Sequence, residues 1–147
     1  MRQRIRDTVA DPAVAERLLP RDYPAAEALG ERPQADVVIA EHDGRPAGFA
    51  LFFHNFSTFR GRRGLYLEDL FVRPEFRKHG LGRQLLAHLA SIAVNRGCGR
   101  MEWSVLNWNE TALKVYRAIG ATPMTEWTVQ RLTGDALEAL AATDTRP

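Results

Sequence analysis

The segment RKHGLGRQLL, residues 77–86, joins two stretches whose apolar residues follow different periods. Before it, LYLEDLFVR (65–73) is apolar at both odd and even positions, which is typical of a β-strand covered on both faces. After it, Leu81, Leu85 and Leu89 recur at the spacing of one helix face. A strand, a glycine-containing loop and a helix in direct succession indicate a fold in which helices pack on a sheet.

The remaining segments extend this arrangement. Asp43-Gly44 separates two apolar stretches and suits a tight turn, which predicts a β-hairpin. The predicted elements, in chain order, are strands at 36–42, 45–56 and 65–73, a helix at 81–96, a strand at 99–107, a helix at 109–119, a strand at 127–132 and a short terminal helix. This order predicts an α/β (α+β) domain with a mixed sheet.

The first thirty residues are predicted to be helical. Met1, Ile5 and Val9 recur every four residues and suggest a short opening helix that Asp11-Pro12 stops. The alanine-rich stretch 13–29 is predicted as a helix in one or two pieces, which ends at Gly30.

The loop before the helix at 81–96 has the features of an anion site. The first N–H groups of a helix lack intrahelical acceptors and carry partial positive charge, and glycines before them let a ligand approach the backbone. Gly80 and Gly82 stand at this place, and the basic side chains around them are Arg73, Arg77, Lys78, His79 and Arg83. The pattern predicts a pyrophosphate site. The segment matches neither the P-loop nor the Rossmann glycine pattern. The alternative is a basic loop in which the glycines serve only the turn.

Two adjacent carboxylates, Glu68 and Asp69, interrupt the strand at 65–73. Strict alternation places Asp69 with Leu65, Leu67 and Phe71, and Glu68 with Tyr66, Leu70 and Val72. A carboxylate in a covered strand is costly unless it has a partner or reaches a wet cleft. The pattern therefore indicates a general base in a cleft, or a β-bulge that re-aims one of the acids. Satisfied or edge-exposed carboxylates are the alternative.

A third segment, residues 107–121, contains polar side chains on a predicted helix. Asn109, Ala112, Leu113 and Tyr116 fall on one face, because positions i, i+3, i+4 and i+7 superimpose. Taken alone, a tyrosine at such a helical core position is more often a packing residue than a chemical one.

Together these segments resemble the GNAT superfamily of acetyl-CoA-dependent N-acetyltransferases. The acyl-CoA signature of that family, Arg/Gln-x-x-Gly-x-Gly/Ala, matches residues 77–82, and its second signature, Asn-x-x-Ala-x-x-x-Tyr-x-x-x-Gly, matches residues 109–120. Within this superfamily the chain is most similar to the diamine (spermidine/spermine-type) acetyltransferases. The segments that carry this similarity are YLEDLFV, the WNE of residues 108–110 and the strand that begins at Trp127. The resemblance covers residues 36–142 and implies a mixed, mostly antiparallel sheet flanked by helices.

The resemblance also implies roles for individual residues. Leu70, Phe71 and Val72 are predicted to bind the cofactor through their backbone, which would pair with the pantetheine arm. Asn109 and Ala112 would contact the arm from its other side. The residues predicted to form the pyrophosphate loop are Arg77, Lys78, His79, Gly80, Leu81, Gly82 and Arg83. Glu68 matches the general base, which acts on the acceptor ammonium through water. Tyr116 matches the general acid that protonates the departing thiolate. Direct transfer of this kind needs no acyl-enzyme.

Two features depart from the family pattern. The family opens with a strand and a helix, whereas this chain reads as if it began within that helix, so its first strand is expected to be missing or very short. The acceptor segment HNFSTFRGRRG contains Arg60, Arg62 and Arg63, which do not favour a polycation. The implied function is transfer of acetyl from acetyl-CoA to a small primary amine. A protein lysine or N-terminus, or a non-catalytic acyl-CoA sensor, are alternatives.

Composition sets limits on the remaining function classes. With 147 residues the chain is expected to form a single domain, and a net charge of +2 gives no reason to expect nucleic acid. Cys98 has no second cysteine to pair with, and neither an apolar leader nor a membrane-length segment is apparent, so a cytoplasmic protein without a membrane partner is expected. The four histidines show no metal-ligand spacing. A homodimer is expected from the resemblance.

Overall fold

The computed structural model describes residues 3–8 and 33–145 of the chain. It divides into two compact units, residues 1–109 and 110–147, which are described separately. The first unit contains the sheet and the predicted anion loop, and the second contains the helix with Tyr116. No helix in the described part of the chain has the length and apolarity that crossing a bilayer requires.

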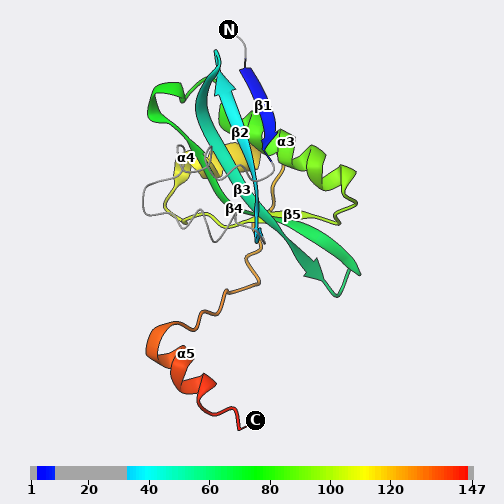
Figure 1. The fold of residues 1–147 in the computed structure, drawn as a ribbon, viewed down its shortest axis with the longest axis vertical. Coiled ribbons are helices and arrows are strands. Elements are labelled where there is room, and N and C mark those ends of the chain that lie inside the picture. The colour runs from blue at the N-terminus through cyan, green and yellow to red at the C-terminus, as the bar shows by residue number, and fades with distance from the viewer. Residues whose placement is uncertain (1–2, 9–32, 146–147) are drawn as a thin grey trace. The chain divides into compact units, whose positions relative to one another are not determined.

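Within the described residues, five strands form one sheet whose spatial order is the order of the chain (Figure 1). The strands are β1 (Gln3–Thr8), β2 (Asp36–His42), β3 (Arg45–Ser57), β4 (Arg62–Val72) and β5 (Met101–Trp103). Neighbouring strands are antiparallel except for β4 and β5, which are parallel. The prediction of a mixed, mostly antiparallel sheet is confirmed.

The N-terminal prediction is wrong where the structure describes it. Residues 3–8 form strand β1, which pairs with β2 from Gln3 opposite His42 to Thr8 opposite Val37. The first strand is therefore neither missing nor very short, and no opening helix forms there. Apolar residues four positions apart fall on one face of a helix, which led to the prediction. Because four is an even number, the same residues also fall on one face of a strand. The helix predicted for 13–29 lies outside the described residues.

The predicted hairpin and the long strand after it are confirmed. Asp43 and Gly44 have φ angles of 49° and 74°, the left-handed conformation that a two-residue hairpin turn of this type requires. β3 pairs with β4 along nearly its whole length, and the turn between them contains Gly61 at φ 60°. β3 is the central strand of the sheet.

Helix α3 (Leu81–Asn95) covers one face of the sheet (Figure 1). It follows the short 3-10 helix η1 (Pro74–Phe76), and Gly97 at φ 68° lies just beyond its end. The predicted helical face is fully buried at Leu81, Leu85 and Leu89, and the strands contribute Phe49, Phe52 and Leu65 to the core. At the end of the helix, Arg96 pairs with Asp36 of β2 at 2.6 Å and lies over the Phe52 ring.

The C-terminal third contains two confirmed helices and two strands that differ from prediction. Helices α4 (Glu110–Ala118) and α5 (Gly134–Ala141) are present. The strand predicted for 99–107 is reduced to the three residues of β5, and residues 127–132 form no strand in the described chain. The second difference has a physical reason, because a strand needs a neighbouring strand for its backbone hydrogen bonds, however favourable its own residues are.

Candidate active site

The sheet opens between β4 and β5. β5 pairs with β4 only at Leu65–Leu67, opposite Met101–Trp103. β4 continues for five more residues, 68–72. Residues 69–72 pair with β3 on one side, and none of the five pairs with a strand of the described chain on the other side. Such an unpaired edge can bind an extended ligand through backbone hydrogen bonds. Leu70, Phe71 and Val72, predicted to pair with a pantetheine arm, all lie on it.

A β-bulge lies where the opening begins. Leu67 is opposite Phe52 and Asp69 is opposite Leu51, so Glu68 is the extra residue of β4. The sequence offered a bulge as one explanation of the adjacent carboxylates, and the register confirms it. Because directly opposite residues share a face, Leu67 and Asp69 lie on opposite faces of the sheet, although they are two residues apart.

The bulge overturns the predicted faces of β4 beyond Glu68. Leu70 and Val72 lie on the α3 face with Leu65 and Leu67, and their methyl groups are near the place that a Cβ on Gly82 would take. Asp69 and Phe71 lie with Tyr66 on the opposite face, where Phe71 packs against Phe49 and Tyr66 against Phe53. Strict alternation would have placed the Asp69 carboxylate in the α3 core, at the cost of its desolvation.

The two carboxylates differ in environment. Asp69 is partly buried, and this burial raises the pKa of its carboxyl group, although a hydrogen bond from the Leu70 backbone opposes the rise. Glu68 is exposed. The structure therefore places an exposed carboxylate at the bulge, next to the start of the open edge.

The predicted anion loop begins at the other end of that edge. Arg77 Nε donates a hydrogen bond of 2.9 Å to the Val72 carbonyl, and its guanidinium lies 5.9 Å from the centre of the Phe71 ring. Arg77 thus fixes the loop to the end of β4. Lys78 has φ 67° and Gly80 has φ 78°, so two of the loop residues are left-handed. This conformation is costly for lysine and easy for glycine.

The N-terminus of α3 is suited to an anion. Gly80 is its N-cap residue, no side chain caps it, and its first turn contains no acidic residue. The first N–H groups of the helix are consequently not compensated by a protein carboxylate. Arg77, Lys78, His79 and Arg83 are exposed around them. The chemistry of these donors fits a pyrophosphate.

The other predicted site residues lie at or beyond the start of α4. Asn109 immediately precedes the helix, and its N–H donates to the Leu106 carbonyl at 2.9 Å. Ala112 and Tyr116 lie on α4 one turn apart. Tyr116 is partly buried, and this burial raises the pKa of its phenol above the ordinary value. Gly120, predicted to close this helix, lies two residues beyond its last residue and has φ 85°.

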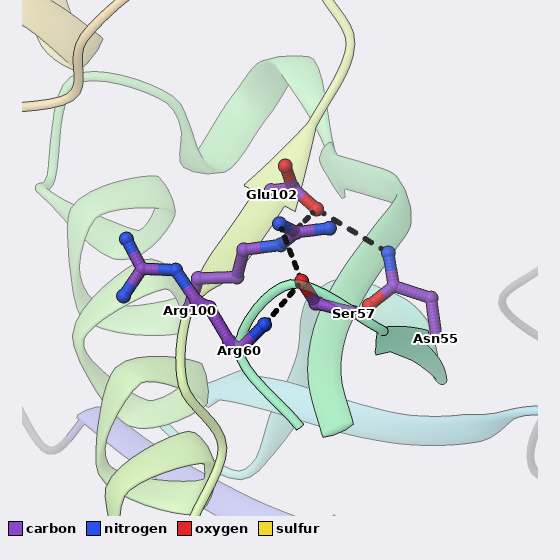
Figure 2. A network of polar contacts seen from close by, with 5 residues as sticks. All are labelled: Asn55, Ser57, Arg60, Arg100 and Glu102. Atoms are coloured by element: carbon purple, nitrogen blue, oxygen red, sulfur yellow. Dashed lines mark hydrogen bonds and ion pairs between the residues drawn. The ribbon is translucent and has the colours of Figure 1, made fainter. Parts of the chain in front are cut away.

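A polar network that the sequence did not indicate connects β5 to β3 across β4 (Figure 2). Asn55 of β3 donates to Glu102 of β5 at 3.3 Å, and Arg100 Nε pairs with the same carboxylate oxygen at 2.7 Å. Ser57 Oγ accepts from Arg100 Nη1 at 3.4 Å and from the Arg60 N–H at 3.3 Å. The network ties β5 to the sheet just before the two strands separate.

Asn55 is opposite Gly64 of β4 in this network. A Cβ atom on Gly64 would overlap Asn55 Oδ1. Glycine therefore leaves the space through which the Asn55 side chain reaches over β4 to Glu102. A single glycine in a strand is a weak sequence signal, which explains why this role was not predicted.

Residues of β1 and β2 that the sequence also did not indicate contact the anion loop. Gln3 Nε2 donates to the His79 carbonyl at 3.0 Å, and the Gln84 side chain donates to Gln3 Oε1. The buried ring of His42 lies 5.3 Å from the His79 ring and 5.4 Å from the Phe76 ring. In the described residues, no group of three or more histidine, cysteine or acidic side chains is placed to hold a metal ion.

The chain is similar to known acetyltransferases. It is 42% identical over 122 residues to an L-ornithine N5-acetyltransferase of Arabidopsis thaliana, covering 83% of this chain and 50% of that protein. It is 35% identical over 127 residues to the thialysine N-epsilon-acetyltransferase of Bos taurus, covering 79% and 74%. The chain thus spans half the length of the plant relative and about three quarters of the bovine one.

The fold is similar to that of a solved structure. An integron cassette protein from the mobile metagenome of V. cholerae has a TM-score of 0.79 and 28% sequence identity, and the match covers 97% of this chain and 99% of that one. A sequence model of the acetyltransferase (GNAT) family matches residues 3–121. With its open sheet edge, its uncapped helix N-terminus and this match over most of its length, the chain belongs to the GNAT acetyltransferase family.

Proposed function

We propose that this protein transfers the acetyl group of acetyl-CoA to the primary amine of a small molecule. One observation carries the proposal: the unpaired edge of β4, residues 68–72, has an exposed carboxylate at one end and an uncapped helix N-terminus at the other. Five residues of strand span roughly 17 Å. This edge can hold the extended arm of acetyl-CoA while the N–H groups of the loop bind its pyrophosphate.

The residues of this edge and loop would bind and orient acetyl-CoA. The backbone of Leu70, Phe71 and Val72 pairs with the pantetheine arm, and the amides of residues 78–83 hold the pyrophosphate, with Arg77 fixing the loop. Asn109 and Ala112 contact the arm from its other side, a role supported by the second family motif. The Val72 carbonyl retains a lone pair for the ligand, because a carbonyl oxygen can accept two hydrogen bonds.

The acceptor must lose a proton before it can react. An alkyl ammonium has a pKa near 10.4, so most of the acceptor is protonated and cannot attack at neutral pH. Glu68 accepts that proton through a water molecule, and the free amine nitrogen attacks the carbonyl carbon of the thioester. The new C–N bond forms and the C–S bond breaks, Tyr116 gives its proton to the departing thiolate, and the second proton that the nitrogen loses passes to solvent, from which the Tyr116 phenolate is protonated again. Burial raises the pKa of the Tyr116 phenol, so the group is protonated at neutral pH and has a proton to give.

The acceptor class is supported by the named relatives and by charge. The two relatives are named for ornithine and thialysine, which are amino acids with a side-chain amine. Glu68 and Asp69 would both attract such a cation. We therefore infer that the acceptor is a side-chain amine of a small amino acid or a diamine, rather than a protein lysine or N-terminus.

A thiol-release assay with acetyl-CoA tests this proposal. We expect turnover with ornithine, thialysine, lysine or a short diamine, and much slower turnover with lysine-containing peptides and with amines blocked by methylation. CoA release with peptides only would overturn the acceptor class. Absence of both turnover and CoA binding, the latter measured by calorimetry, would overturn the enzyme assignment itself.

We further propose that the whole chain acts as one acetyltransferase domain and that it forms a homodimer in the cytoplasm. The dimer is supported by apolar side chains that are exposed in the second unit, with Trp127 at 69% and Val129 at 79% exposure. Burial of such residues by a second copy removes apolar surface from water. Light scattering at micromolar concentration tests the dimer, and a monomer mass would contradict it. The cytoplasmic assignment is supported by the unpaired Cys98.

A further inference from the structure

The side chain of Gln3 connects strand β1 to the anion loop at two points. Its Nε2 atom donates to the His79 carbonyl at 3.0 Å, and its Oε1 atom accepts from the Gln84 side chain. His79 lies one residue before the N-cap of α3, and Gln84 lies in the first turn of that helix. A single amide therefore bridges the loop and the helix that follows it.

The contact at His79 fixes the direction of the next N–H group. All peptide bonds of the described chain are trans, and in a planar trans peptide the carbonyl of one residue and the N–H of the next point in opposite directions. Because Gln3 holds the His79 carbonyl toward β1, the Gly80 N–H points away from β1. That N–H belongs to the helix N-terminus at which the pyrophosphate would bind.

The loop needs such support because its backbone is not in its easiest conformation. Lys78 is left-handed at φ 67°, immediately before His79. A non-glycine residue in this conformation is strained and persists only where its surroundings hold it. His42, opposite Gln3 in the β1–β2 pair, supports the same loop by stacking against the His79 and Phe76 rings.

We propose that Gln3 is a positioning residue for acetyl-CoA, which sets the orientation of the 79–80 peptide and thereby aims the Gly80 N–H at the pyrophosphate. The inference rests on the proposed function, since it assigns the pyrophosphate of that cosubstrate to the loop. Gln3 touches neither the acetyl group nor the acceptor amine in this scheme. Its replacement should therefore weaken binding of acetyl-CoA and leave the chemical step unchanged.

The test compares the wild type with Gln3→Met, which keeps the length of the side chain and removes both hydrogen bonds. We expect the Kd for CoA and the KM for acetyl-CoA to rise roughly tenfold, since loss of one to two neutral hydrogen bonds is of that order. The kcat should be unchanged. Gln84→Met, which leaves the bond to the His79 carbonyl intact, should raise the same constants less than about threefold. Gln130→Met, at an exposed position in the second unit, is the matched control and should have no effect.

A second substrate separates positioning from a general structural effect. S-acetylpantetheine carries the same thioester but has no pyrophosphate, so kcat/KM with this substrate should be equal in the wild type and in Gln3→Met. An unchanged CoA affinity in Gln3→Met would overturn the proposal, and so would equal losses with both thioesters. If Gln3→Met does not fold, Gln3→Asn, whose amide is one methylene too short to reach His79, is compared in the same way. Failure of the wild type to bind CoA would instead refute the proposed function.

Discussion

Gly64→Ala is expected to destabilise the wild-type protein and to stabilise a variant in which Asn55 is already alanine. A Cβ atom on Gly64 would overlap Asn55 Oδ1 and would lie 3.4 Å from Asn55 Cγ and 3.5 Å from Arg100 Cγ. The Arg100 contact is an ordinary one. Asn55 must therefore turn away, and its hydrogen bond to Glu102 is lost.

The expected magnitude follows from two opposing effects. A hydrogen bond to a charged partner contributes about 1.5–3 kcal/mol, and the partly exposed site favours the lower end of that range. Alanine is favoured over glycine inside a strand by about 0.5–1 kcal/mol, because glycine loses more backbone entropy on folding. The net change in the free energy of unfolding should be a loss of about 1 kcal/mol in the wild type. In the Asn55→Ala background only the entropy effect remains, so the same substitution should gain about 0.5–1 kcal/mol.

Urea unfolding of the four proteins, the wild type, the two single variants and the double variant, measures both changes. The slope of unfolding free energy against urea should be the same in all four, which shows that the denatured state is unaffected. Destabilisation of similar size in both backgrounds would refute the reasoning, because the clash with Asn55 would then not be its cause.

Three further predictions concern the proposed chemistry and its pH dependence. Glu68→Gln should lower kcat/KM by about 10²-fold or more, with CoA affinity unchanged in calorimetry, while Asp69→Asn should cost less; the reverse order would assign the base to Asp69. Tyr116→Phe should lower kcat about tenfold to a thousandfold with little change in melting temperature, and full turnover with chemistry shown to be rate-limiting would end the general-acid assignment. Burial and the nearby Arg96 lower the pKa of His54 below 6.5 in the folded protein. As the pH falls, this histidine is therefore protonated in the unfolded chain before it is protonated in the folded protein. The free energy of unfolding should therefore decrease as the pH falls through 6.5, and urea titrations should find a smaller decrease in His54→Gln.

The elements that the sequence predicted best are those whose signals are local. Asp43-Gly44 marks a turn that only its own two residues need to satisfy, and the face of Leu81, Leu85 and Leu89 lies within one helix. The acyl-CoA motif likewise identified a loop and a helix N-terminus that are adjacent in the chain. Such features depend on few distant residues, so the sequence contains most of the information about them.

The features that the sequence did not predict depend on partners elsewhere. The bulge at Glu68 was only one of three options, because β4 is apolar on both faces and a shift of the alternation by one residue leaves no trace in such a pattern. The contact of Gln3 with His79 joins residues 76 positions apart, and neither residue type indicates it. The stretch 127–132 has the composition of a strand, but composition does not supply a neighbouring strand.

The spatial order of the sheet, which repeats the order of the chain, has a consequence for how the protein folds. β2, β3 and β4 are joined by short turns, so they can pair early at a small cost in loop-closure entropy. β5 can join only after the chain has crossed over through α3, and it then adds three residues of pairing to an edge that already exists. The opening between β4 and β5 thus lies between the strands that can pair early in folding and the strand that is added late. The protein can leave this edge incompletely paired without slowing formation of its central strands.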